Sequence, residues 1–337
     1  MRWKLIGILV ALVVVGLGVY GWGIGLFYPC GPITNLVGSA SCRVIASFPA
    51  TQLQMLELTP DGTLLTVRRG DGRDPVEPQR LVEIDLDGRT LGEIALPSIE
   101  PKLSWGPTAL SADGRMLALT SVDKRTTVLD RSTGAELGGV DLYGVTYVGF
   151  DSEDRLLLDM GFGSFERPPA NVAQVYQLDG TQVGEVTGAA AAPIFTNAIA
   201  AVSTADGVLM AQHLETLKDT GIVAVRIIEN QFASWAGQLL VAPLGSWRLG
   251  GQQLPELSFS PDGKYLAASF DAPDEWGSEN SALIVWRIAD RQVVARVPTW
   301  RAEWRNITWL PGRPAVAVQR FNLDTRASDV AVITYRE

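Results

Sequence analysis

Apolar and polar residues alternate along most of this chain in short runs, and each run ends at a turn. An alternating run, a turn, a second apolar run, a loop and a third run recur six times. The turns are Asp61-Gly62, Asp113-Gly114, Ser152-Glu153-Asp154, Asp206-Gly207, Asp262-Gly263 and Pro311-Gly312. Alternation with a period of two is typical of half-buried strands, and Asp-Gly pairs between such runs are typical of tight hairpins. The pattern predicts a succession of antiparallel hairpins.

The turns lie about 50 residues apart, a repeat length typical of propeller blades. Further turns at Asp87-Gly88, Thr133-Gly134 and Asp179-Gly180 add a fourth strand to the early repeats. We therefore expect an all-β fold over residues 43–337, a β-propeller of six blades or, as the alternative, seven.

The sixth repeat, Asn306 to Tyr335, is one strand short. Residues 43–48, Arg-Val-Ile-Ala-Ser-Phe, have the character of the outer strand at 291–296. We expect residues 43–48 to supply the missing strand beside the last repeat, as a clasp that covers an otherwise open edge.

The fifth repeat contains Phe-Ser-Pro-Asp-Gly-Lys-Tyr-Leu-Ala at 259–267 and Ile-Val-Trp-Arg-Ile at 284–288. With these segments the chain resembles, in divergent form, the WD-repeat family and the related TolB-like propellers. The resemblance implies a propeller over residues 43–337. Six-bladed propellers also include lactonase-like hydrolases, whose central metal is held by carboxylates and amides; Glu256 and Asn306 are the candidates here.

Residues 5–27 run without a charge, long enough for a helix of about 34 Å to cross a bilayer. Arg2 and Lys4 precede this segment, and the next basic residue is Arg43. Because basic residues stay on the cytoplasmic side, we expect residues 1–28 to form a cytoplasmic tip and one transmembrane helix of a bacterial inner membrane. The propeller would then lie in the periplasm, or otherwise outside the cytoplasm, and contact lipid through residues 5–27.

Residues 29–42 form a neck that holds the two cysteines of the chain, Cys30 and Cys42. In an oxidising compartment an even pair of cysteines predicts a disulfide; two free thiols are the alternative.

Glycines at 18, 21 and 25 share one face of the expected helix. This face either packs on another membrane helix or reflects the ordinary glycine content of such segments.

Long loops are expected opposite the short turns, and Trp105, Trp247, Trp276, Trp300 and Trp304 fall in them. Exposed tryptophans are typical of binding hot spots, although each could instead pack beneath its own loop. Asp271, Asp274 and Glu275 add an acidic cluster with Glu279, for which we consider a basic partner, a calcium ion or simple solvation. These residues define the expected interaction face.

The net charge of −9, without a basic stripe, argues against a nucleic-acid partner. His213 is the single histidine, and no nucleophile motif accompanies it, so we predict no catalytic residues, metal site or cofactor. The sequence predicts a membrane-anchored interaction scaffold or accessory subunit of an inner-membrane complex. A metal-assisted hydrolase and a small-ligand sensor are the alternatives.

Overall fold

The structure is a computed structural model. It describes residue 30 and residues 40–49, 52–53, 55–69, 79–96, 105–121, 125–142, 145–160, 172–187, 201–203, 209–213, 222–229, 238–243, 256–273, 279–300 and 302–336. Within these ranges no helix is long and apolar enough to cross a bilayer. The expected span at residues 5–27, including Gly18, Gly21 and Gly25, lies outside them.

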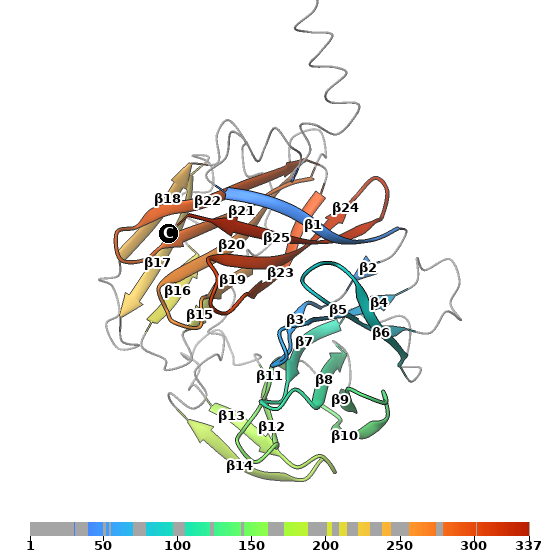
Figure 1. The fold of residues 1–337 in the computed structure, drawn as a ribbon. Helices are drawn as coiled ribbons and strands as arrows, with labels where there is room; N and C mark the ends of the chain where they lie inside the picture. Colours follow the sequence, from blue (N-terminus) through green and yellow to red (C-terminus); the bar gives the residue numbers. More distant parts are fainter. Residues whose placement is uncertain are drawn as a thin grey trace, which may run out of the picture.

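The described strands form antiparallel sheets that follow one another along the chain (Figure 1). The first sheet holds β2 (Gln52–Leu53), β3 (Glu57–Leu58), β4 (Leu64–Arg69), β5 (Arg80–Ile84) and β6 (Thr90–Ala95). The second holds β7 (Trp105–Leu110), β8 (Met116–Ser121), β9 (Thr126–Asp130) and β10 (Glu136–Val140). The third holds β11 (Val145–Phe150), β12 (Leu156–Met160), β13 (Val172–Tyr176) and β14 (Gln182–Thr187).

The remaining three sheets have the same strand order, except that the last takes its outer strand from the N-terminal side. The fourth holds β15 (Ala201–Ser203), β16 (Leu209–His213), β17 (Ile222–Glu229) and β18 (Gln238–Pro243). The fifth holds β19 (Glu256–Phe259), β20 (Tyr265–Pro273), β21 (Glu279–Arg287) and β22 (Gln292–Trp300). The sixth holds β23 (Ala302–Trp309), β24 (Ala315–Asn322), β25 (Ser328–Tyr335) and β1 (Ala40–Phe48). Successive antiparallel sheets of four strands, with five in the first sheet, match the blades of a β-propeller.

The predicted Asp-Gly turns form where the structure describes them. Gly114 and Gly263 have φ of 70° and 67°, a region that residues with a side chain rarely adopt. In the second turn, Asp113 Oδ1 accepts hydrogen bonds from Ser111 Oγ at 2.6 Å and Arg115 N at 2.9 Å. The carboxylate therefore stabilises the turn through contacts within two residues, which explains why the sequence alone predicts the turn.

Apolar side chains are buried mainly between neighbouring sheets. Four clusters join the first sheet to the second, the second to the third, the sixth to the first and the fifth to the sixth. The largest buried side chains include Trp286, Trp304 and Met55. The first, second and sixth sheets are thus buried on both faces, as blades are.

Strand β1 pairs antiparallel with β25, so residues far apart in sequence lie side by side (Figure 1). The pairing includes residues 43–48 except Ile45, as predicted for the clasp strand, and extends back to Ala40. Arg43 Nη2 also donates to the Leu86 carbonyl of the first sheet at 2.8 Å. The clasp strand therefore contacts two sheets.

A bulge between Val44 and Ala46 interrupts this pairing. Before it, Ala40, Cys42 and Val44 pack in the cluster shared with the fifth sheet; after it, Ala46 and Phe48 pack in the cluster shared with the first. Because an extra residue reverses the alternation of side chains, the bulge lets β1 serve both faces of the sixth sheet.

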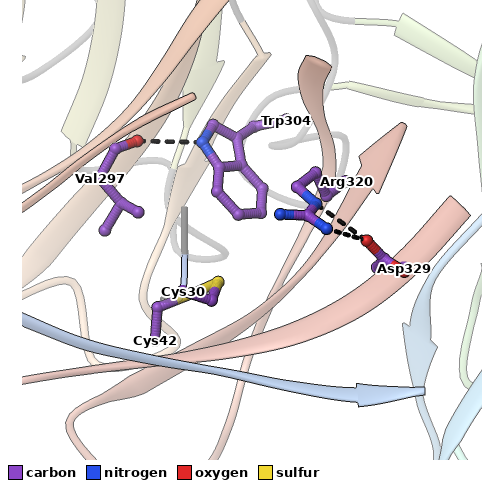
Figure 2. The surroundings of a disulfide bond; sticks show 6 residues. All are labelled: Cys30, Cys42, Val297, Trp304, Arg320 and Asp329. Atoms are coloured by element: carbon purple, nitrogen blue, oxygen red, sulfur yellow. Dashed lines mark hydrogen bonds and ion pairs between the residues drawn. A yellow bond between two sulfur atoms is a disulfide. The ribbon is translucent and has the colours of Figure 1, made fainter. Parts of the chain in front are cut away.

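The side chain of Asp329 ties three strands of the sixth sheet. Its Oδ1 accepts a hydrogen bond from Ser47 Oγ of β1 at 2.6 Å, and its Oδ2 accepts one from Arg320 Nε of β24 at 2.9 Å. Asp329 itself, on β25, is 6% exposed. The ion pair with Arg320 is therefore largely removed from water (Figure 2).

Two stretches differ from the simple alternation in the sequence. Residues 53–58 form two short strands, β2 and β3, and the Thr66 hydroxyl donates to the Met55 carbonyl at 2.7 Å where the ladder is interrupted. Asp271, expected in a long loop of the interaction face, lies instead on β20 and pairs with Ser281 of β21. Pairing between the two strands makes this hairpin longer than the alternation of apolar and polar residues predicts.

Replacing Asp329 with Ala should lower the free energy of unfolding by about 2–4 kcal/mol, because a largely buried guanidinium loses its charged partner. Urea unfolding at pH 7 measures this. Asp290→Ala is the matched control, since the Arg287–Asp290 pair is 30% and 40% exposed and should change stability little. Equal effects of the two substitutions would contradict a special role of Asp329 in holding the clasp.

Candidate functional site

A cavity of about 680 Å³ opens between inner strands of three sheets. It is lined by residues 57–60 with Gly62, by residues 108–112, by residues 148–150 and by Pro311. Several of these residues belong to turns that join first and second strands, namely β3–β4, β7–β8 and β23–β24. The cavity therefore lies at the short-turn end of the sheets, whereas the sequence directed attention to the long loops.

Glu57 is the one acidic side chain among the described residues that line the cavity. It is half-buried, and its Oε1 accepts a hydrogen bond from Thr108 Oγ1 at 3.1 Å. Burial raises the pKa of Glu57 to about 7; the Thr108 hydrogen bond opposes this rise, and the nearby charge of Glu256 adds to it. The carboxyl group thus titrates close to neutral pH.

Glu256, on the inner strand of the fifth sheet, binds the backbone of the sixth. Its two carboxylate oxygens accept hydrogen bonds from Asn306 N at 2.5 Å and Ile307 N at 2.6 Å. β23 bulges between Arg305 and Thr308, where Asn306 has φ of 54°. The two N–H groups therefore have no place in the ladder with β24. Glu256 therefore caps backbone groups that the bulge removes from the ladder.

The same region carries a chain of polar contacts between the sixth and first sheets. Asn306 Nδ2 donates to Gln319 Oε1 at 2.5 Å, and Gln319 Nε2 donates to the Leu53 carbonyl at 2.8 Å. Thr308 Oγ1 donates to the Leu56 carbonyl at 2.5 Å. Gln319, on β24, is fully buried, so this network satisfies polar groups within the contact between the sixth and first sheets.

The candidates from the lactonase-like resemblance, Glu256 and Asn306, do lie together. However, the carboxylate of Glu256 is held by two backbone donors, which fits a structural cap better than a metal ligand. Within the described ranges, no group of three or more His, Cys, Asp or Glu side chains is placed to hold a metal ion. In the part of the chain that the structure describes, Glu256 and Asn306 therefore do not form the metal site that the resemblance implies.

The predicted disulfide is confirmed: Cys30 and Cys42 are bonded, with their Cα atoms 4.5 Å apart (Figure 2). Cys42 is 4% exposed and belongs to the cluster between the fifth and sixth sheets, and Cys30 packs against the same cluster. The bond therefore fixes the neck to the propeller core.

Trp304 departs from the expected interaction face. Its side chain is 1% exposed, and its Nε1 donates to the Val297 carbonyl at 3.0 Å (Figure 2). Of the two alternatives for the tryptophans, packing holds for Trp304, because its buried indole, with a hydrogen-bonded N–H, fills space between β22 and β23.

The other residues of that face are placed less fully. Trp105, Trp300 and Asp271 lie on β7, β22 and β20, where the structure describes the backbone alone. Trp247, Trp276, Asp274 and Glu275 lie outside the described residues. Their role in binding stays a prediction.

Sequence reasoning missed Glu57, although a signal was present. Glu57 lies four residues before Asp61 of the first turn, and the equivalent positions before Asp113 and Asp262 are Ala109 and Ser258. Two other repeats have a small residue at this position of the inner strand. An acidic residue there indicates a role other than packing in the apolar core.

Replacing Glu57 with Gln should raise the melting temperature at pH 8 by about 2–4 °C. The native pKa of about 7 lies above the ordinary glutamate pKa of 4.5. Ionisation therefore destabilises the native state as pH rises through this interval, and Gln removes that loss. The gain should shrink toward pH 5, where the native carboxyl is protonated.

Glu83→Gln is the control for this measurement, because Glu83 also accepts a threonine hydrogen bond, from Thr63 at 2.5 Å, but does not line the cavity. A gain for Glu57→Gln that is equal at pH 5 and pH 8 would show that charge is not the cause.

No protein-family model matches the chain. No curated protein matches it either. Among solved structures, the β-propeller domain of Cps50 (Swd1) from Myceliophteria thermophila is similar with a TM-score of 0.49 and 14% identity, covering 86% of this chain and 99% of that chain. The fold is supported by the strand pairing within this chain and not by this likeness.

Proposed function

We propose that the six sheets close into a six-bladed ring that residues 5–27 anchor in a bacterial inner membrane. The ring faces the periplasm, with the N-terminus in the cytoplasm. There the protein acts as an interaction scaffold or accessory subunit of a membrane complex, and the glycine face at residues 18, 21 and 25 packs on another subunit.

The disulfide supports the periplasmic placement. Disulfides persist in oxidising compartments and are rare in the cytosol. Cys30 follows the expected span by three residues, so the bond holds the propeller close to the bilayer surface. The orientation expected from Arg2 and Lys4 puts Cys30 and Cys42 on that oxidising side.

If the propeller is periplasmic, Cys30 and Cys42 should be oxidised in intact cells. We expect no thiol labelling when cells are lysed into a maleimide reagent under denaturing conditions, and labelling of both cysteines after prior reduction. Labelling of both without reduction would place the domain in a reducing compartment and refute the placement. The Cys30→Ser/Cys42→Ser double variant gives the background signal.

The observation that carries the interaction role is a repeated apolar position on the outer strands. Leu91, Leu137 and Val183 are 56%, 42% and 43% exposed. Each is the second residue of its strand, on β6, β10 and β14 respectively. Single exposed apolar residues are ordinary on protein surfaces, but recurrence at one position of three consecutive sheets favours a shared contact surface on the rim.

The full-length protein, extracted from its own membrane in mild detergent, should run at a native mass above that of a monomer and contain other membrane subunits in fixed proportion. Replacing Leu91, Leu137 and Val183 with Ser should release the partner at least partly, because the apolar contact area is lost.

The matched control carries Arg89→Ser, Ala135→Ser and Thr181→Ser, which change exposed positions two residues away on the same rim. A monomer from the unaltered protein would refute the scaffold role. Equal release by both triple variants would assign the contact to another surface.

A further inference from the structure

The lining of the cavity beside Glu57 combines one carboxylate with hydroxyl and apolar groups. Among the described residues that line it, Glu57 is the charged group, and no basic side chain is present. Three residues with hydroxyl groups line it, Thr59, Thr108 and Ser111, and apolar surface comes from Leu58, Leu110, Val148 and Phe150. A single carboxylate beside apolar side chains complements a cation with a hydrocarbon body.

We propose that this cavity binds an organic ammonium group, paired with the Glu57 carboxylate, while the attached hydrocarbon packs on Leu58, Leu110 and Phe150. This is a binding site separate from the scaffold surface on the rim. The volume of about 680 Å³ lies within the range of small-molecule sites.

The contacts of Glu57 show why a bound cation would stabilise its carboxylate. The Thr108 hydroxyl binds one carboxylate oxygen, Oε1, at 3.1 Å. The half-buried charge also lies near the like charge of Glu256, which is itself engaged with Asn306 N and Ile307 N. A cation at Glu57 would offset both the desolvation and the repulsion, so binding and ionisation should favour each other.

Binding should therefore depend on pH through one group. Thr108 of β7 and Glu256 of β19 are the described side chains that act on the charge of Glu57. With a pKa of about 7 in the free protein, roughly a tenth of Glu57 is ionised at pH 6 and roughly nine tenths at pH 8. A ligand that binds the ionised form should bind about tenfold more tightly at pH 8 than at pH 6.

The test is calorimetric titration of the full chain, in detergent micelles, with n-butylammonium, 1-butanol and butyrate. Butylammonium is protonated at both pH values, as lysine is. We expect it to bind at least tenfold more tightly than 1-butanol at pH 8, to weaken about tenfold at pH 6, and to exceed butyrate throughout.

Glu57→Gln should abolish the preference for butylammonium over 1-butanol, and Glu83→Gln should preserve it. Both variants are measured in the same micelles, which corrects for partitioning of the probes. Since the pH series uses the unaltered chain, it tests Glu57 even if a variant fails to fold. Equal binding of butylammonium and 1-butanol, or an unchanged preference in folded Glu57→Gln, would overturn the proposal.

The ammonium group can belong to a free amine or to a lysine of a protein partner. Nα-acetyl-lysine methylamide distinguishes these sources: tighter binding than butylammonium assigns the site to a lysine side chain, and weaker binding assigns it to a free amine. Both results retain the ammonium assignment. Neither bears on the native mass of the complex, so this site and the scaffold role can fail separately.

Discussion

The antiparallel pairing of β1 with β25 is the constraint on which the rest of the structure depends. It brings together side chains as distant as Ser47 and Asp329, 282 residues apart in sequence. The entropy of closing so long a loop grows only slowly with its length, so the ladder and its buried apolar contacts can offset it. Without β1, the edge of β25 and apolar groups of two clusters would be exposed to water.

The register of this pairing governs neighbouring features. Cys42 lies opposite Ile333, and a slip of one residue would turn Cys42 away from the core in which Cys30 packs. The bulge after Val44 brings the Ile45 carbonyl against the turn of the first sheet. A Cβ on Gly88 would lie 1.8 Å from that oxygen, so this turn requires glycine both for its φ of 90° and for the close approach of β1. The clasp, the disulfide and a turn in another sheet are therefore one connected arrangement.

The sequence predicts the strands and turns well because their causes are local. The Asp113 carboxylate binds a hydroxyl and an amide within two residues of itself, and alternation marks the flanking strands. The candidate site depends instead on pairs distant in sequence, such as Glu57 with Thr108. Trp304 shows the same limit, because an aromatic residue looks alike in sequence whether it lies on a surface or fills a core. The extended hairpin at Asp271 likewise results from cross-strand pairing, which a single strand does not reveal.

Glu57 differs from Glu256, Asn306 and Gln319 in what it does for the fold. Glu256, Asn306 and Gln319 satisfy backbone or amide groups that would otherwise be buried without partners. Their removal should therefore leave unpaired groups behind. Glu57 accepts a bond from a hydroxyl that could equally bind water in the cavity, while burial disfavours its charge. A residue that weakens the native state at neutral pH, in a cavity with a mixed polar and apolar lining, is better explained by binding than by stability.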